Sequence, residues 1–311
     1  MRRRTFLLGS AGAAAGSAAA ALTGCTIEGN GPGGTGPGEE DGKGGVTGTV
    51  LAVKIDNVGP ARPHTGLAEA SVIHVEQVES GLSRLLAVYA AEDLPPVIGP
   101  VRSARETDLA LLGQYGRPVL AYSGAQGKLQ PLIADAELIA RPPERSSGAY
   151  FRSADRPAPH NLYLRPARLK PAITARDLTP AGLRFGPPPP GGTPTAVRTV
   201  RFPSARFTFT WSAAKKRWQV AMDGAAGALA PATVVVQKTR VRDSRFHDRW
   251  GNSSPYTETV GSGTAVVLRD GRAYEAKWER PDARAETVYT SPDGERLSFA
   301  RGQLWIAYVK R

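Results

Sequence analysis

The chain has 311 residues, of which 41% are hydrophobic, a formal net charge of +12 and one cysteine. With a single cysteine it cannot form an internal disulfide, so its fold depends on a hydrophobic core even outside the cytosol. The basic charge suggests an anionic partner such as nucleic acid, lipid headgroups or a wall polymer. An excess of Arg, with abundant Ala, Gly and Pro, also results from a high-GC genome, so charge alone does not select among these explanations.

Residues 1–25 are typical of an export signal. Arg3-Arg4-Thr5-Phe6-Leu7 fits the twin-arginine pattern, and Leu22-Thr23-Gly24-Cys25 fits the lipobox at which a signal peptidase cleaves and a lipid is attached. A transmembrane anchor is the alternative, but Gly and Ser break the apolar stretch before it reaches the roughly 20 residues that a spanning helix needs. We therefore expect a secreted lipoprotein, held on the outer face of the cytoplasmic membrane by acyl chains such as palmitate on Cys25. Export removes nucleic acid from the expected partners.

Composition divides the rest of the chain. Residues 26–48 are Gly-rich with a net charge of −3, which predicts a flexible tether. About 260 residues follow, enough for two domains. Residues 187–198 are rich in Pro and Gly and predict a linker, so we expect an N-terminal domain over 49–186 and a C-terminal domain over 199–311. Residues 191–311 carry a net charge of +9.

The N-terminal domain mixes strand and helix patterns. Apolar, β-branched runs predict strands over 50–55, 72–78, 85–90 and 119–122, and helical patterns follow Ser103 and cover 128–134 and 166–176. Ser103 and Glu106 have the spacing of a capping box for the first helix. Gly124–Lys128 precedes the second helix and predicts a tight turn, because it lacks the spacing of a Walker loop.

The C-terminal domain has short strand patterns separated by Asp-Gly turns. The strands expected there cover 233–236, 264–268, 274–278 and 304–309, mostly in an antiparallel sheet. The fold class is therefore α+β: an α/β-type domain with a mixed sheet and helices, followed by a β-rich domain. Four tryptophans lie in or beside these segments, and we expect them to be packed in the core rather than to bind glycan. They are Trp211, Trp218, Trp278 and Trp305.

Two arginines lie where the first helix is expected to begin. Free backbone N–H groups and guanidinium forks at such a position can bind carboxylate or phosphate, so Arg102, Ser103 and Arg105 are candidate ligand-binding residues. The alternative is that either arginine pairs with an internal carboxylate, for which Glu79 or Asp108 is available. The residues alone do not separate the two.

Other polar residues lie at or near the ends of the expected strands, where sites are commonly built. The candidates are Asp56, Asn57, Arg62, Glu79, Arg84, His160 and Asn161. Glu76 and Glu79 invite a general acid/base interpretation, although residues three apart on a strand point to opposite faces unless the chain turns near Ser80. Solvated or ion-paired charges are the more common role of such carboxylates.

Signals for other chemistry are weak. No GxSxG motif is present and the lone cysteine is assigned to lipidation, so no hydrolytic triad is supported. The four histidines are scattered without the close pair typical of zinc sites, and each is expected to be structural. We expect neither a metal nor a cofactor.

Several short motifs, in order along the chain, are similar to those of a known family. They are Asp56-Asn57, Ala61-Arg62-Pro63, Ser80-Gly81-Leu82-Ser83-Arg84, Gly99–Arg105, Pro159–Tyr163, Val260–Gly263, Arg269-Asp270-Gly271, Lys277-Trp278 and Gly302–Trp305. The chain resembles the YerB family of bacterial lipoproteins, whose two parts are paired domains of unknown function. The resemblance implies secretion and lipid anchoring, but no activity, cofactor or catalytic residue. His74-Val75 and Ser80-Gly81 depart from the family pattern, which has Tyr-Glu and Gly-Gly there.

Two functional hypotheses follow. The leading one is a non-enzymatic envelope module that binds an anionic wall component or a partner protein through an Arg-rich cleft formed by the candidate residues. The alternative is a hydrolase that acts on wall glycan or peptide, with Glu79 or Asp56 as acid or base and His160 as helper. A third hypothesis is a scaffold whose basic C-terminal domain contacts anionic lipid.

Overall fold

The structure, a computed structural model, describes residues 49–311 apart from residues 92, 172, 249 and 250. The predicted signal with Cys25 and the predicted tether of residues 26–48 lie outside the described residues. No helix in the described ranges is long and apolar enough to cross a membrane.

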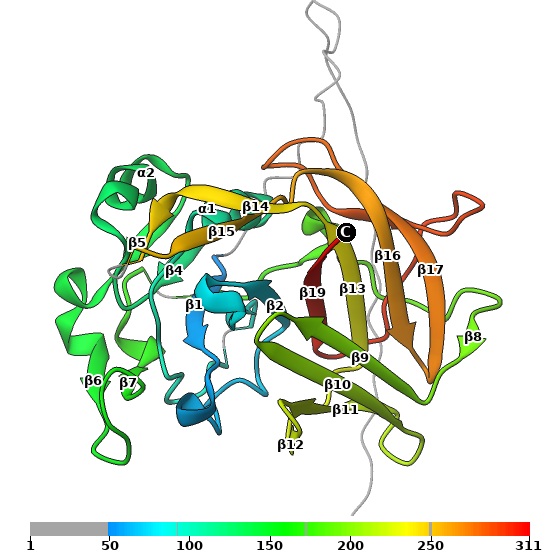
Figure 1. Ribbon diagram of the computed structural model, residues 1–311, viewed down its shortest axis with the longest axis horizontal. Coiled ribbons are helices and arrows are strands. Elements are labelled where there is room, and N and C mark those ends of the chain that lie inside the picture. The colour runs from blue at the N-terminus through cyan, green and yellow to red at the C-terminus, as the bar shows by residue number, and fades with distance from the viewer. Residues whose placement is uncertain (1–48, 92, 172, 249–250) are drawn as a thin grey trace, which may run out of the picture. The chain divides into compact units, whose positions relative to one another are not determined.

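A mixed sheet organises the fold, in the order β18-β17-β16-β13-β19-β2-β3-β1-β4-β5, with β8 paired to β17 (Figure 1). The first part of the chain contributes β1 (Leu51–Asp56), β2 (Val72–Gln77), β3 (Ser83–Tyr89), β4 (Val119–Ala121) and β5 (Ile139–Arg141). The second part contributes β8 (Thr193–Pro194), β13 (Thr233–Thr239), β16 (Gly261–Arg269), β17 (Arg272–Arg280), β18 (Val288–Thr290) and β19 (Leu304–Lys310). β19 is parallel to both of its neighbours, β13 and β2.

Smaller sheets complete the fold. β9 (Val197–Phe202), β10 (Ala205–Ser212), β11 (Arg217–Met222) and β12 (Ala225–Ala226) form an antiparallel sheet. β14 (Val241–His247) pairs with β15 (Ser253–Thr257), and β6 (Tyr150–Arg152) pairs with β7 (Leu162–Leu164). The helices are α1 (Glu106–Leu112) and α2 (Gln130–Asp135). The expected fold class, α+β, is confirmed.

Strands from both predicted domains meet in the main sheet, and the described residues from 49 onward belong to one compact unit. The segment 187–198, predicted as a linker, contains β8 and the first residues of β9. The two-domain division stays a prediction from composition.

The main sheet is covered on both faces, which explains why every residue of β1 is buried. Alternate residues such as Val53 belong to a core shared with Phe207 and Trp218 of the small antiparallel sheet. The residues between them belong to a second core, which includes Leu111 of α1 and Ile133 of α2.

The expectation for the tryptophans is confirmed, because Trp218, Trp278 and Trp305 are at most 2% exposed. Trp211 is partly buried and packs against the core that contains Trp218 and Trp305.

Two local predictions were wrong. The predicted helix over 166–176 is only a 3-10 turn at Pro166–Arg168, because Pro171 lacks an N–H and disfavours helical backbone in the residue before it. The predicted capping box of Ser103 and Glu106 is also absent. Instead, the Asp108 carboxylate accepts a hydrogen bond from the backbone N–H of Arg105 at 2.7 Å.

Candidate functional site

Charged side chains gather where three neighbouring strands end. The register places Asp56 opposite Arg84 and Arg84 opposite Glu76. Because side chains alternate along a strand, Lys54 lies on the same face as Asp56, and the apolar Val53 faces the other core. These charges form one group at this edge of β1, β2 and β3.

The deepest charges fix α1 to the sheet. Lys54 Nζ donates to Asp108 at 2.7 Å and also contacts the Glu76 carboxylate, and all three side chains are at most 1% exposed. Burial lowers the pKa of Lys54 to about 8, although Asp108 acts in the opposite direction. With no access to solvent, this group is structural.

Glu79 and Arg105 form a two-point ion pair. Arg105 Nε and Nη2 donate to the two Glu79 oxygens at 2.6 and 2.7 Å, and the Ser254 hydroxyl contacts the same carboxylate. Burial alone would raise the pKa of Glu79, but the hydrogen bonds from Arg105 and Ser254 outweigh it, so the pKa is lowered. Glu79 is therefore a poor proton donor near neutral pH.

Asp56, at the end of β1, contacts two basic side chains. Its Oδ2 lies 2.8 Å from His160 Nδ1 and 3.2 Å from Arg102 Nε. The carboxylate is 3% exposed, whereas the His160 and Arg102 side chains are 20% and 23% exposed. Asp56 therefore fixes both side chains at the border between core and solvent.

Arg84 differs from Arg102 and Arg105. In the part of the chain that the structure describes, no carboxylate lies within ion-pair distance of it, and its Nη1 donates only to the Ser103 carbonyl at 3.3 Å. Burial, followed by the nearby Arg105 charge, lowers the pKa of Arg84 to about 9. A guanidinium held in this way gains from an added anion.

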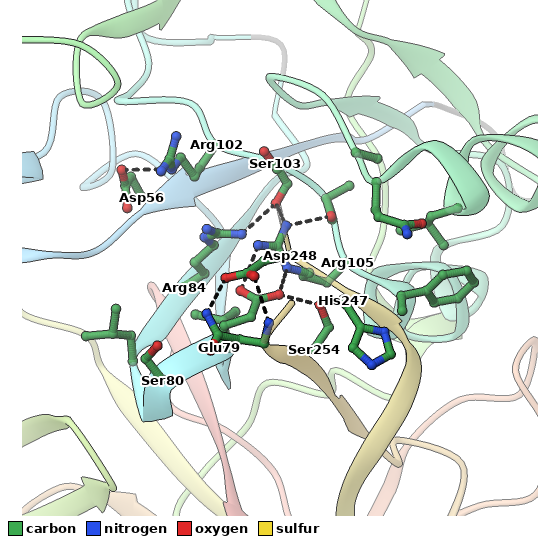
Figure 2. A pocket seen from close by; sticks show the side chains of 18 of the residues that line it. Asp56, Glu79, Ser80, Arg84, Arg102, Ser103, Arg105, His247, Asp248 and Ser254 are labelled. Atoms are coloured by element: carbon green, nitrogen blue, oxygen red, sulfur yellow. Dashed lines mark hydrogen bonds and ion pairs between the residues drawn. The ribbon is translucent and has the colours of Figure 1, made fainter. Parts of the chain in front are cut away.

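A cavity of about 830 Å³ opens beside these side chains (Figure 2). The acidic and basic residues of its lining are Asp56, Glu79, Arg84, Arg102, Arg105, Glu106, His160, His247 and Asp248. Apolar side chains, among them Leu82, Leu129 and Phe246, line other parts. The cavity can therefore accept a ligand that has both a charged group and an apolar portion.

Most of the predicted site residues line this cavity, but three do not. Asn57 and Asn161 each follow a lining residue but do not line the cavity themselves; Asn57 Nδ2 donates to the Ser83 hydroxyl and Asn161 Nδ2 to the Ser153 carbonyl. Arg62 bonds the Asn57 carbonyl and pairs with Asp223 at 2.9 Å. These three residues therefore hold loops beside the cavity, and their part in a binding site stays a prediction.

The predicted anion site at the start of α1 stays a prediction. Arg102 and Arg105 are both paired with internal carboxylates, which was the alternative interpretation, and α1 has only seven residues. Arg105 pairs with Glu79, one of the two carboxylates that the sequence made available to it. Glu76 and Glu79 do not converge, since each has a different basic partner.

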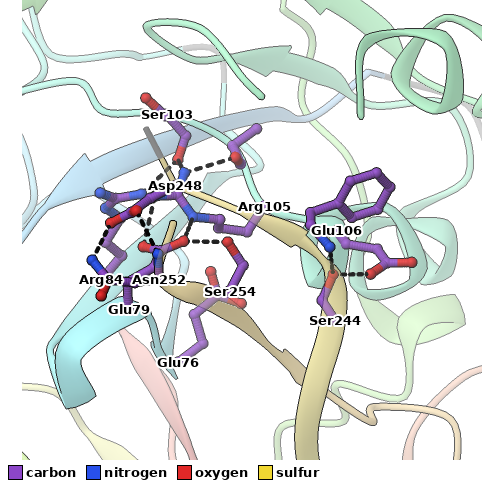
Figure 3. A network of polar contacts seen from close by, with 12 residues as sticks. Glu76, Glu79, Arg84, Ser103, Arg105, Glu106, Ser244, Asp248, Asn252 and Ser254 are labelled. Carbon is purple, nitrogen blue, oxygen red and sulfur yellow. Dashed lines mark hydrogen bonds and ion pairs between the residues drawn. The ribbon is translucent and has the colours of Figure 1, made fainter. Parts of the chain in front are cut away.

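Sequence reasoning missed the contribution of the β14–β15 hairpin. The hairpin lies across α1 and places Phe246, His247, Asp248, Asn252 and Ser254 on the cavity. Figure 3 shows the contacts that hold it, Ser254 to Glu79 and Ser244 Oγ to Glu106 at 2.6 Å. These contacts join residues more than 130 positions apart, so no local pattern could have predicted them.

The histidines have separate environments. His74 Nδ1 and Nε2 lie 2.9 and 2.8 Å from the hydroxyls of Tyr308 and Tyr115, which fits the expected structural role. Within the described ranges, no group of three or more His, Cys, Asp or Glu side chains could hold a metal ion.

The fold and the cavity define a class: an α+β protein with a cluster of charged side chains where β1, β2 and β3 of its main sheet meet the cavity. Comparison with known proteins identifies the family. Residues 35–179 match the N-terminal domain, and residues 198–306 the C-terminal domain, of the family described as "Protein of unknown function (DUF3048)". The chain belongs to this family.

Two similar proteins bear on this assignment. A Bacillus subtilis (strain 168) protein named "Putative lipoprotein YerB" is 22% identical over 277 residues, which cover 83% of this chain and 80% of that protein. The crystal structure of the YerB protein from Bacillus subtilis matches with a TM-score of 0.69 at 18% identity, over 84% of this chain and 91% of that chain. The resemblance inferred from short motifs is thus confirmed, and the fold is shared.

Proposed function

We propose that the chain is a lipid-anchored protein of the cell envelope that binds an anionic wall component, or an acidic segment of a partner protein, in the cavity beside Arg84. The anchor is Cys25, which the lipobox pattern predicts. The name of the Bacillus subtilis relative, a lipoprotein, supports the same location on the outer face of the cytoplasmic membrane.

One observation carries the binding proposal, namely the guanidinium of Arg84. Arg102 and Arg105 already have carboxylate partners, whereas Arg84 bonds only the Ser103 carbonyl among the residues that the structure describes. Glu79 and Asp56 act on Arg84 only from beyond ion-pair distance. A buried guanidinium without a close carboxylate partner among the described residues favours an incoming carboxylate or phosphate, which would form charge-assisted hydrogen bonds with it.

A second feature narrows the ligand. Gln126 lines the cavity, and its buried Oε1 has no hydrogen-bond donor among the described residues. A ligand with a hydroxyl or amide N–H would satisfy this oxygen. The ligand class that fits is therefore an anion with a hydrogen-bond donor, as in a wall peptide with a free carboxylate or a glycerol phosphate chain.

Calorimetric titration tests the binding proposal, with disaccharide-tetrapeptide muropeptides and poly(glycerol phosphate) as probes. We expect Arg84→Gln to weaken binding at least tenfold, because a hydrogen bond to a charged group contributes about 1.5–3 kcal/mol. Arg117→Gln, at an exposed position outside the cavity, should leave affinity unchanged. Equal affinity of the wild type and Arg84→Gln for a bound probe would refute the role of Arg84. If neither probe binds, a pull-down of the acylated protein from its own membranes, with the same two variants, tests whether the ligand is instead an acidic segment of a partner protein.

The anchor is tested separately. Mass spectrometry of the membrane-extracted protein should find acyl chains on an amino-terminal Cys25, and Cys25→Ser should release the chain from the membrane. An unmodified amino terminus in the wild type would contradict the anchor.

A hydrolytic role is the second candidate, and it is favoured by the contact between Asp56 and His160. A carboxylate that orients an imidazole beside a cavity is a common arrangement for a general base. Glu79 is not part of this candidate, because both of its oxygens are engaged and its pKa is lowered. An enzyme should lose about 10² to 10⁴ in turnover of purified wall material on His160→Gln, while a binding protein has no turnover to lose.

A further inference from the structure

The small antiparallel sheet has one face packed in the core and one face exposed. Phe207, Phe209, Trp218 and Val220 point inward and are at most 2% exposed. Side chains alternate, so the residues between them form the outer face. Figure 1 shows this sheet as β9, β10 and β11, away from α1 and the β14–β15 hairpin.

This outer face is basic. The register pairs Arg201 with Arg206 across β9 and β10, and Ser212 with Arg217 across β10 and β11. Lys215 and Lys216 lie exposed in the turn between β10 and β11. We call Arg201, Arg206, Lys215, Lys216 and Arg217 the basic sheet face.

Acidic residues do not balance these charges. Residues 197–226 contain six basic residues and one acidic residue, Asp223. The Asp223 carboxylate is already engaged, since it pairs with Arg62 at 2.9 Å and accepts the backbone N–H of Arg206 at 2.7 Å. The basic sheet face therefore keeps its positive charge available to an external partner.

The face also carries an exposed apolar side chain. This side chain is Val197, which is 52% exposed, and no other large hydrophobic side chain of the described residues is classed as exposed. Its register partner on β10 is Thr210, whose side chain is uncharged and exposed. A layer of cations with an apolar side chain among uncharged neighbours suits the headgroup region of an anionic bilayer, where charges meet phosphates and apolar groups enter the interface.

We infer that the basic sheet face docks on the anionic lipid headgroups of the membrane that holds the chain. The inference rests on the lipid anchor proposed above. The 23 residues between Cys25 and Thr49 can span at most about 80 Å when fully extended, so the folded part stays within reach of the bilayer. Docking there would fix the orientation of the cavity relative to the membrane.

Vesicle sedimentation tests this docking with the mature chain carrying Cys25→Ser, so that acylation makes no contribution. The probes are phosphatidylcholine vesicles with and without phosphatidylglycerol. We expect binding only to the anionic vesicles, with loss at high salt. Arg201→Glu with Arg206→Glu should lower partitioning at least about 30-fold, because each basic residue near an anionic surface contributes roughly a factor of five.

The matched control reverses two charges elsewhere. Arg117→Glu with Lys128→Glu makes the same change in net charge at exposed positions of the first part of the chain. Equal losses in the two double variants would show that net charge alone drives binding, and would overturn the inference. Thermal unfolding of each variant checks that the fold is retained.

Two further outcomes would also overturn it. One is the absence of binding to anionic vesicles, and the other is binding of soluble poly(glycerol phosphate) through the same face without vesicle binding, which would assign the face to a wall polymer. The vesicle result does not depend on Cys25, so failure of the proposed anchor, seen by mass spectrometry, is distinguishable from failure of the docking face.

Discussion

Replacing Glu79 by Gln tests how the charged edge of the sheet is held together. The Glu79 and Arg105 side chains are 7% and 13% exposed, and two hydrogen bonds of 2.6 and 2.7 Å join them. Removing one partner of a buried pair typically costs about 3–5 kcal/mol, because the other charge is left uncompensated. Since Arg105 is slightly exposed, we expect Glu79→Gln to cost about 3 kcal/mol, a large share of the roughly 5–15 kcal/mol that stabilises a typical domain.

Urea denaturation of four proteins measures this coupling: the wild type, Glu79→Gln, Arg105→Met and the double variant. If the pair acts as a unit, the double variant should be destabilised by at least about 2 kcal/mol less than the sum of the single variants. The exposed pair of Arg284 and Glu137, also 2.6 Å apart, is a control, and Arg284→Gln should cost less than about 1 kcal/mol. Additive effects at Glu79 and Arg105 would refute the proposal that they form a coupled buried pair.

Two further predictions concern stability. Burial lowers the pKa of His74 from 6.5 to about 3, so its neutral form stabilises the fold fully above about pH 6.5, and this contribution falls by about 2 kcal/mol by pH 5 as the unfolded chain takes up the proton. Denaturation at pH 7 and pH 5 should show that His74→Gln loses this part of the pH dependence of stability. The control His247→Gln, at an exposed position, should retain it. An unchanged pH dependence in His74→Gln would contradict the assignment of this effect to His74. Gly182 and Gly191 both have positive φ, but a Cβ on Gly182 would lie 2.1 Å from the Thr287 carbonyl oxygen, whereas one on Gly191 would meet nothing within 4 Å. Thermal unfolding should therefore show that Gly182→Ala is more destabilising than Gly191→Ala, which should cost about 1 kcal/mol, and equal losses would contradict the close packing at Gly182.

Some of the site was predictable because it depends on neighbouring strands. Asp56 and Arg84 directly border the segments 50–55 and 85–90, whose patterns predict strands, and Glu79 directly follows the predicted strand over 72–78. Their proximity follows from ordinary sheet pairing. That Asn57 does not line the cavity follows from the same alternation, because it directly follows Asp56 and consecutive residues on an extended chain point to opposite sides.

Other parts depend on the tertiary structure. The start of α1 offers Glu106 and Asp108 as capping acids, and the sequence pattern does not show that the buried Lys54 holds Asp108 in place. The hairpin that covers α1 comes from the second part of the chain, and its contacts with Glu79 and Glu106 form only when both parts fold together. The position of β19 between β13 and β2 is non-local in the same way.

The central claim is that Arg84 is the cation which accepts an anionic ligand. The most direct measurement is the side-chain Nε–Hε resonance of Arg84 in a ¹⁵N-labelled mature chain, assigned by its loss in Arg84→Lys, during titration with the muropeptide and poly(glycerol phosphate) probes. We predict a saturable shift of this resonance that gives the same Kd as calorimetry, with smaller shifts for the paired Arg102 and Arg105. Saturable binding of a probe that leaves the Arg84 resonance unchanged would contradict the claim.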